Sequence, residues 1–414
     1  MPQPPWWSLI LKRRFFLCIL TGFASGLPLF FLFQLVPGWL RDQHVDLASI
    51  GLLSLVQFPY TWKFLWAPLM DRFELPFLGL RRGWLLLTQL GLLAAMATFA
   101  LCDPKQGLEP IVWVAILVAA FSASQDIVID AFRREILADN ELGLGNAIHI
   151  NAYRLAGLIP GSLSLILADH LPWSTVFVIT AGFMAVGLLL TLIADEPTHE
   201  RHPSTWQQAV VEPFHEFFSR HGVKAALLLL AFMVLYKLGD NMATALQTPF
   251  YLDMGYSKSE IGLVAKHAAL WPAVFGGLLG GILMLKIGIN RSLWLFGLVQ
   301  MVSILGYALL AWLPLETRNL WWLALVVATE YLGVGLGAAA LTAFIAREAN
   351  KTFLATQLAL LTALTAVPRV LANAATGFMV DSVGWVHFYL ICALVALPGM
   401  ALLPWVAPWQ RKTD

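Results

Sequence analysis

The sequence predicts an all-α integral membrane protein of twelve transmembrane helices, arranged as two pseudo-repeated six-helix bundles. Hydrophobic residues make up 59% of the 414 residues and charged residues only 12%, whereas soluble domains carry about twice that charged fraction. Apolar runs of about 20 residues, the length that crosses a bilayer, recur along the whole chain. Short motifs also recur in the same order in the two halves. These observations exclude an ordinary soluble domain.

Twelve apolar runs are expected to cross the bilayer, each as one helix. The first six are 15–37, 48–66, 83–102, 110–131, 144–168 and 173–194. After a polar, proline-containing stretch come 223–247, 260–285, 291–313, 320–343, 355–379 and 385–408. Glycine and proline interrupt the first, second, eighth and ninth runs, so their ends are the least sharply defined.

The polar stretch after the sixth run divides the chain into an N-terminal six-helix bundle, a linker and a C-terminal six-helix bundle. The expected boundaries are 1–197, 198–222 and 223–414. The halves are weakly similar: Ile50-Gly51-Leu52 recurs as Ile261-Gly262-Leu263, and Arg154 aligns with Arg369 at a comparable offset. The repeated order indicates a parallel duplication of six spans, as in transporters whose solute site lies between the halves.

The distribution of basic residues predicts a multi-pass protein with both termini in the cytoplasm. In that orientation most loop lysines and arginines lie inside, and those that fall outside are Arg41, Lys105, Lys258 and Arg318. The first apolar run has no convincing cleavage site after it, so we expect a retained span. The net charge of +1 argues against a nucleic-acid partner.

An acidic pair lies towards the end of the fourth run, in Ser122-Ala-Ser-Gln-Asp-Ile-Val-Ile-Asp-Ala131. Asp126 and Asp130 are four residues apart and share one helix face. Because a charge inside a bilayer is costly, such residues usually face a cavity or a partner. We expect both to couple proton movement to transport. The alternatives are a structural pairing of Asp126 with Arg154, and a gate or latch role for Asp130.

Other intramembrane polar residues are candidates for the same path. Glu330 is a further candidate for proton coupling. The candidates for solute binding are Gln125, Arg154, Lys237, Asp240 and Arg369. Gln125 could instead bond helix to helix, Arg154 could offset a buried carboxylate, and Lys237 and Asp240, three residues apart, could neutralise each other.

The loop after the second run contains Ala67-Pro-Leu-Met-Asp-Arg72 and then Gly79-Leu-Arg-Arg-Gly83. This pattern is similar to the loop motif of major facilitator transporters, in which acidic, glycine and basic residues latch neighbouring helix ends. The resemblance implies a gating loop formed by Asp71, Arg72, Arg81 and Arg82. The alternative is an ordinary loop that follows the positive-inside rule.

No pattern typical of an enzyme is recognised. There is no zinc-ligand spacing, nucleotide-binding loop or serine–histidine set, so we expect no catalytic residues, metal or cofactor. The three cysteines form no C-x-x-C pair. Without an ATP-binding domain, transport should be secondary rather than driven by ATP.

Several segments resemble AmpG-type permeases of the major facilitator superfamily, and the resemblance covers nearly the whole chain. They are Gly22–Leu29, Lys63–Arg72, Arg81–Trp84, Ser122–Ala131, Ser257–Val264 and Ala355–Val367. The resemblance implies a proton-driven permease of the bacterial inner membrane that imports anhydro-muropeptides. The important glutamine and aspartates of the family match Gln125, Asp126 and Asp130.

The chain also resembles a short, twelve-span branch of this family that includes the pyochelin permease FptX, since enterobacterial AmpG has two further spans. That branch implies import of a ferri-siderophore of the pyochelin type, with anhydro-muropeptide import as the alternative. The 17 Trp and 26 Phe residues could stack on an aromatic chelate. However, Trp is enriched at any membrane interface. We therefore expect the partners to be protons, the lipid bilayer and one of these two solutes.

Overall fold

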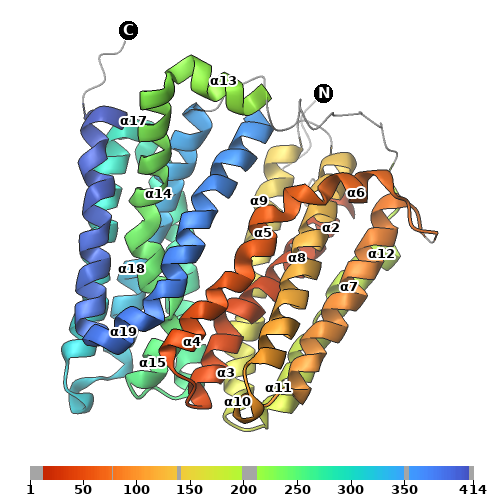
Figure 1. The fold of residues 1–414 in the computed structure, drawn as a ribbon, viewed down its shortest axis with the longest axis horizontal. Coiled ribbons are helices and arrows are strands. Elements are labelled where there is room, and N and C mark those ends of the chain that lie inside the picture. The colour runs from red at the N-terminus through yellow and green to blue at the C-terminus, as the bar shows by residue number, and fades with distance from the viewer. Residues whose placement is uncertain (1–12, 77, 138–140, 198–211, 349–353, 410–414) are drawn as a thin grey trace, which may run out of the picture. The chain divides into compact units, whose positions relative to one another are not determined.

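The structure is a computed structural model that describes all residues except 1–12, 77, 138–140, 198–211, 349–353 and 410–414. The described residues form helices and connecting turns, with no β-strand among them (Figure 1). The helices divide into two compact units. Unit 1 comprises Met1–Val45, Val56–Arg201 and Ser257–Leu263, and unit 2 comprises Asp46–Leu55, His202–Tyr256 and Val264–Asp414.

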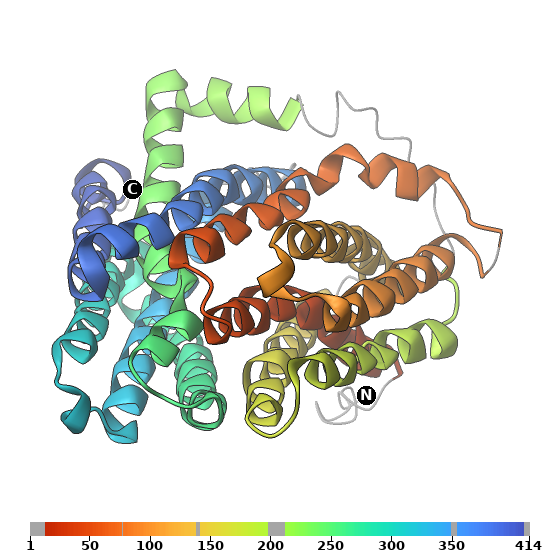
Figure 2. The same cartoon turned by 60° about the horizontal axis from the view of Figure 1, so that its bottom comes forward.

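Unit 1 is a bundle built mainly from the first half of the sequence (Figures 1 and 2). Its α-helices are α2 (Arg13–Phe30), α3 (Val36–Asp42), α5 (Phe58–Trp62), α6 (Ala67–Arg72), α7 (Leu80–Thr98), α8 (Glu109–Ile136), α9 (Leu142–Ala156), α10 (Ser164–Ala168), α11 (Trp173–Gly182), α12 (Ala185–Ile193) and α16 (Lys258–Glu260). Buried apolar residues from α2, α7, α8 and α12, including Leu17, Leu85, Phe132 and Leu190, pack together as its core. Burial of these side chains against one another holds the four helices side by side.

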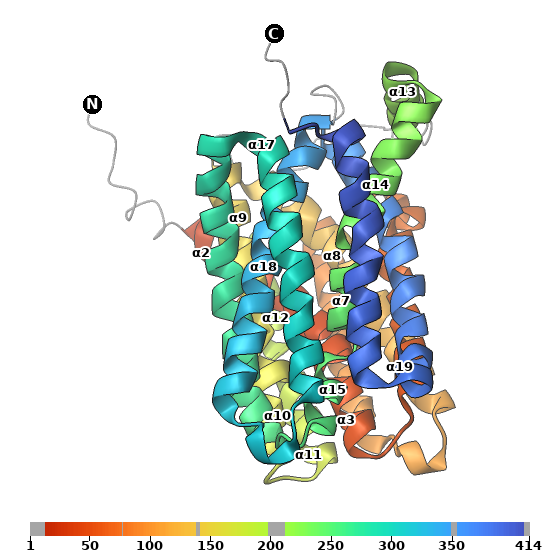
Figure 3. The same cartoon turned by 90° about the vertical axis from the view of Figure 1, so that its left-hand side faces the viewer.

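Unit 2 is built mainly from the second half of the sequence. Its α-helices are α4 (Leu47–Leu52), α13 (Glu212–His221), α14 (Val223–Ala245), α15 (Gln247–Asp253), α17 (Lys266–Trp312), α18 (Leu320–Glu348) and α19 (Leu354–Val406). Figure 3 shows α14, α17, α18 and α19 running side by side. Phe232, Phe296, Phe344 and Leu403 belong to the apolar core between them.

Two of the long helices turn back at a glycine. Gly288 in α17 has φ 78° and Gly384 in α19 has φ 76°, a left-handed conformation that glycine adopts without a steric cost. Each of these helices is therefore two rods that meet at a sharp turn. The rods correspond to the predicted spans 260–285 and 291–313, and 355–379 and 385–408.

The predicted membrane-spanning fold is confirmed. Among the described residues, eight helices are long and apolar enough to cross a bilayer, or up to nine if one bent pair counts as a span. Two of the eight contain the glycine turns just described. The predicted second span, 48–66, is a series of short helices that begins with α4 and includes the 3₁₀ segments Leu53–Gln57 and Lys63–Leu65. Leu285 and Trp321 expose 88% and 83% of their surface, as side chains in contact with lipid would.

One helix departs from the predicted organisation. Residues 212–221, assigned above to the linker, form α13, which is bent by 110° from α14 (Figures 1 and 2). Phe217 on α13 is 3% exposed and joins the core of unit 2, so burial of an aromatic side chain anchors this segment. The rest of the linker, 198–211, lies outside the described residues. The predicted domain boundaries remain a prediction.

Candidate transport site

A buried polar cluster lies in unit 2, where α14, α17 and α18 meet. Glu330 on α18 has no exposed surface, and its Oε2 accepts a hydrogen bond from Ser303 Oγ on α17 at 2.6 Å. On α14, Lys237 Nζ lies 2.8 Å from Asp240 Oδ2. The predicted mutual neutralisation of Lys237 and Asp240 is therefore present. We call Lys237, Asp240, Gln300, Ser303 and Glu330 the carboxyl cluster.

The carboxyl cluster has more acceptors than donors. Among the described residues, no N–H or O–H group of a neighbour satisfies Glu330 Oε1, Asp240 Oδ1 or Gln300 Oε1. The Glu330 carboxyl lies within hydrogen-bonding reach of the Asp240 carboxyl. A hydrogen bond between two carboxyl groups requires a proton on one of them. With one lysine for two carboxyls, the cluster is neutral when it holds one proton and negative when it holds none.

A glycine leaves room for the carboxyl cluster. A Cβ at Gly337 on α18 would lie 2.0 Å from Gln300 Oε1 and 3.7 Å from Lys237 Nζ. Gln300 and Ser303 were missed by the sequence analysis, since neither is charged or part of a motif. The available signal was their spacing of three residues within an apolar span, which puts both on one helix face.

A hydrogen-bonded aromatic group lies in the same unit, and its members were also missed. Gln247 Nε2 donates to Tyr307 OH at 2.7 Å, and Tyr331 OH donates to Gln247 Oε1 at 2.6 Å. The hydroxyls of Tyr251 and Tyr307 are 3.3 Å apart. Because Tyr331 follows Glu330 directly, this group and the carboxyl cluster share one stretch of α18. The hydrogen bond of Tyr331 to Gln247 therefore helps to hold the backbone of α18 in place beside Glu330.

In unit 1, the predicted acidic pair divides into two environments. Asp126 on α8 accepts a hydrogen bond from Ser25 Oγ on α2 at 2.5 Å. Gln125 Nε2 donates to the Ala24 carbonyl at 2.8 Å, as in the helix-to-helix alternative, and its Oε1 is buried with no partner among the described residues. Asp130 is exposed, 2.9 Å from Arg133 and 4.0 Å from Lys63.

The structure does not bring together Arg154 and Asp126. Arg154 lies half-buried on α9, and no hydrogen bond or ion pair joins it to Asp126 in the described part of the chain. The partner expected from the sequence is replaced by Ser25, because α8 packs against α2 at that depth. The apparent twin, Arg369, lies exposed on α19.

The predicted gating loop is tied to its own unit through its two last arginines. Arg81 donates to Glu135 on α8 with Nη2–Oε1 at 2.8 Å, and Arg82 Nε donates to the Thr191 carbonyl at 3.0 Å. The Glu196 carboxylate accepts from the backbone N–H groups of both arginines at 2.7 and 3.0 Å. A carboxylate is stabilised at such a helix N-terminus. The side chains of Asp71 and Arg72 lie outside the described structure.

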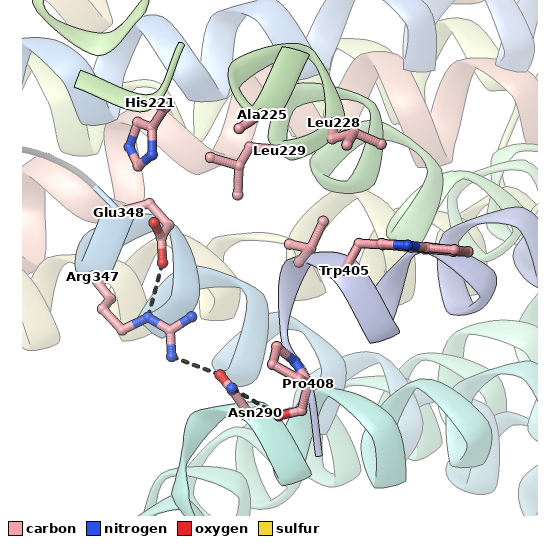
Figure 4. Close-up of a pocket in the computed structure, with 10 residues that line it drawn as sticks. His221, Ala225, Leu228, Leu229, Asn290, Arg347, Glu348, Trp405 and Pro408 are labelled. Atoms are coloured by element: carbon pink, nitrogen blue, oxygen red, sulfur yellow. Dashed lines mark hydrogen bonds and ion pairs between the residues drawn. The ribbon is translucent and has the colours of Figure 1, made fainter. Parts of the chain in front are cut away.

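A pocket of about 290 Å³ opens beside the start of α14 in unit 2 (Figure 4). Arg347 forms an ion pair with Glu348 at 2.9 Å and donates to Asn290 Oδ1 at 2.7 Å, so its guanidinium is already occupied. Trp405 closes another side of the pocket. None of the predicted site residues lines this pocket.

Residues 18–372 match the family profile of the Major Facilitator Superfamily. This chain belongs to that superfamily. The nucleoside transporter NupG, a solved structure, superposes on this major facilitator protein with a TM-score of 0.74 at 13% identity, covering 95% of this chain and 100% of that one. At that identity the likeness shows the fold alone. The predicted fold class is confirmed.

The curated relatives include AmpG-type permeases. The anhydromuropeptide permease of Escherichia coli (strain K12) is 41% identical over 95% of this chain and 79% of its own length. An uncharacterised protein of Haemophilus influenzae is 50% identical over 98% of this chain and 97% of its own. The resemblance to AmpG-type permeases is thereby confirmed, whereas these relatives give no support to the resemblance to FptX. A major facilitator protein is a multi-pass secondary transporter, consistent with the expectation that the chain is not an enzyme.

Proposed function

We propose that this major facilitator protein imports anhydro-muropeptides across the bacterial inner membrane, coupled to protons, with both termini in the cytoplasm. The observation on which the proposal depends is the 41% identity to the E. coli anhydromuropeptide permease over 95% of the chain. The siderophore, which was the first expectation from the sequence, has no comparable support. It becomes the competing outcome of the uptake test.

The carboxyl cluster supports proton coupling. Taking up or releasing one proton changes its net charge inside a low-dielectric bundle, where an uncompensated charge is costly. Two conformations that differ in water access to Glu330 and Asp240 would therefore bind that proton with different affinity, and the proton would shift their populations. This is the physical requirement for coupling a proton gradient to a conformational cycle.

Arg154 supports an anionic solute. It is half-buried on α9, and its guanidinium forms no ion pair within the described residues. Arginine stays charged at working pH and presents a planar set of donors that suits a carboxylate. A peptide carboxylate would supply the missing partner. Tyr153 precedes it on the same helix, and its ring packs at a tilt of 56° against Phe30 of α2, with the ring centroids 5.3 Å apart.

Paired uptake tests the solute. A strain that lacks its own permeases for both solutes expresses the full chain and receives radiolabelled anhydro-muropeptide or iron-pyochelin separately. We expect accumulation of the muropeptide alone, abolished by a protonophore. Accumulation of the iron chelate alone would overturn the proposal in favour of the siderophore branch, and accumulation of neither would refute both solutes.

Asp126→Asn tests proton coupling in unit 1. The amide keeps the acceptor for Ser25 Oγ but cannot take up a proton, so the position no longer responds to the gradient. We expect the initial uptake rate to fall about tenfold and to lose its dependence on external pH, because the contact that remains is no longer charge-assisted. The matched control is Asp195→Asn, at an exposed carboxylate that pairs with Arg13 in the same unit. Normal uptake with normal proton dependence in Asp126→Asn would exclude this role.

A further inference from the structure

Three buried oxygen atoms of the carboxyl cluster lack a donor. They are Asp240 Oδ1, Gln300 Oε1 and Glu330 Oε1, and no N–H group or hydroxyl of the described residues donates to them. The three residues come from α14, α17 and α18 and are 3%, 3% and 0% exposed. Because a buried oxygen without a partner costs free energy, such atoms in a native protein indicate a bound proton, water or ion.

One proton satisfies only two of the three oxygens. A proton on Glu330 lets this carboxyl donate to Asp240, which lies within hydrogen-bonding reach. Gln300 Oε1 is then still without a donor, because an amide oxygen accepts hydrogen bonds and carries no proton of its own. A hard cation differs from the proton in this respect, since several oxygens coordinate it at once. The third oxygen therefore indicates a ligand other than the proton alone.

Two glycines of α18 make room for the Gln300 amide beside the charged residues. A Cβ at Gly333 would lie 3.2 Å from Gln300 Cα, and a Cβ at Gly337 would lie 2.0 Å from Gln300 Oε1. The Gly337 position is also 3.7 Å from Lys237 Nζ, and that ammonium lies 2.8 Å from Asp240 Oδ2. Residues 333 and 337 share one face of α18, so α17 approaches closely along that face. The amide oxygen is thereby held near the acidic side chains.

The charge of the carboxyl cluster suits one monovalent cation. Asp240 and Glu330 contribute two negative charges when both are ionised, and Lys237 contributes one positive charge, which its contact with Asp240 Oδ2 keeps on one side of that carboxylate. A monovalent cation between the remaining oxygens makes the cluster neutral. A divalent ion would leave an excess positive charge, which is costly inside a bundle that crosses a bilayer.

The other titratable groups that face the two carboxyls do not change this charge. They are phenols and one thiol, which are uncharged at neutral pH. These groups belong to Tyr236, Tyr251, Tyr307, Tyr331, Tyr389 and Cys392. The lysine and the two carboxyls of the cluster therefore determine which ion it attracts.

We propose that the carboxyl cluster binds one Na⁺ ion between Asp240 Oδ1, Gln300 Oε1 and Glu330 Oε1, in competition with the proton. Carboxylate and amide oxygens are the donors that hard cations prefer. Charged oxygens favour the smaller Na⁺ over K⁺, because the field strength of the ligands contributes to selectivity. The ion is exchangeable and not a resident cofactor. The inference uses the cluster invoked above for the proton, but it needs neither a particular solute nor transport.

Binding of radioactive sodium to the purified full chain tests the proposal. The protein is kept in detergent at mildly alkaline pH, where competition from protons is weak, with choline chloride to hold the ionic strength constant. We expect saturable binding that unlabelled NaCl displaces and the same concentration of KCl does not. As the pH falls, the apparent Kd for Na⁺ should rise by up to about tenfold per pH unit, since each cation displaces one proton.

Gln300→Met separates the ion from the proton. It keeps the length of the side chain and both carboxyls but removes the amide oxygen, so we expect the Kd for Na⁺ to rise about tenfold. The matched control is Gln89→Met, at a buried glutamine of α7 in unit 1, which should keep the parental Kd. Glu330→Gln removes a charged ligand and should abolish binding, whereas Glu316→Gln, at an exposed carboxyl of unit 2, should not. Thermal unfolding in choline chloride verifies that each variant is folded.

Two results would refute the sodium site. If the parent shows no saturable binding, or if KCl displaces the ion as well as NaCl does, the three oxygens are satisfied by a proton and water instead. If both Gln300→Met and Glu330→Gln bind Na⁺ with the parental Kd, the ion lies elsewhere in the protein. The assay contains no solute, so a failure of muropeptide uptake leaves its outcome unchanged. Equally, an absence of sodium binding leaves proton-coupled import standing.

Discussion

Glu330→Gln should abolish proton-driven accumulation while the protein still exchanges solute across the membrane. The amide imitates the protonated carboxyl in size and in its ability to donate to Asp240, so the carboxyl cluster remains neutral in every conformation. Because residue 330 can then no longer bind or release a proton, the two conformations no longer differ in proton affinity there, and the proton gradient cannot shift their populations. We expect the ratio of internal to external solute to fall to about 1, the value for passive equilibration.

The measurement is uptake into proteoliposomes with an imposed pH gradient, followed by counterflow from liposomes preloaded with unlabelled solute. Counterflow should persist because it needs conformational change but no net proton movement. The matched control is Glu316→Gln, an exposed carboxyl in the same unit. Accumulation at the parental ratio in Glu330→Gln would assign the coupling proton elsewhere, with Asp126 the first alternative.

The spans could be predicted because burial in lipid imposes a simple composition on long stretches of sequence. The turns at Gly288 and Gly384 coincide with gaps between predicted spans, where the chain reverses through a residue with positive φ. The segment α13 was missed because its prolines and charges are typical of a linker. Its first turn nevertheless tolerates Pro213, and Phe217 supplies the apolar contact that makes it a helix.

The sites were predicted unevenly, for a physical reason. The Lys237–Asp240 pair followed from helical spacing, which is a local property. The partners of Asp126 and Glu330, Ser25 and Ser303, come from other helices, and nothing local in the sequence specifies which helix packs where. Charged residues were recognisable by their cost in a membrane, whereas the hydroxyls that satisfy them were not.

The duplication predicted from the repeated Ile-Gly-Leu motif did not reveal that residues 46–55 pack in unit 2 and residues 257–263 in unit 1. The repeat fixes which residues are equivalent, and both copies place their glycine, Gly51 or Gly262, against a neighbouring backbone. The neighbour comes from the other half of the sequence in each case. Comparing two segments of the sequence is enough to show that their residues are equivalent. Which helix each segment packs against depends on the arrangement of all the helices.

Lys237→Met should be the most destabilising single change in the carboxyl cluster. The lysine side chain is 15% exposed and that of Asp240 4% exposed, so its removal leaves two carboxyls in a bundle with no cation beside them. Breaking a buried ion pair by removing one partner costs about 3 kcal/mol or more. For a unit of this size the expected fall in Tm is about 5–10 °C, measured by thermal unfolding of the purified protein in detergent.

The double variant Lys237→Met with Asp240→Asn separates charge from packing. Removing both charges leaves Glu330 with a neutral amide that can share a hydrogen bond with its protonated carboxyl. We therefore expect the double variant to regain most of the lost Tm, since replacing a buried pair by uncharged groups is often close to neutral. If the fall in Tm of the double variant instead equals the sum of the falls in the two single variants, the lysine stabilises unit 2 by packing or through its contact with the Val334 carbonyl at 3.4 Å. The double variant could also regain its Tm without regaining solute accumulation. That result would give Lys237 and Asp240 a role in proton coupling as well as in the stability of unit 2. The physical reason is that the neutral cluster is stable but has lost one of the two carboxyls that hold the proton.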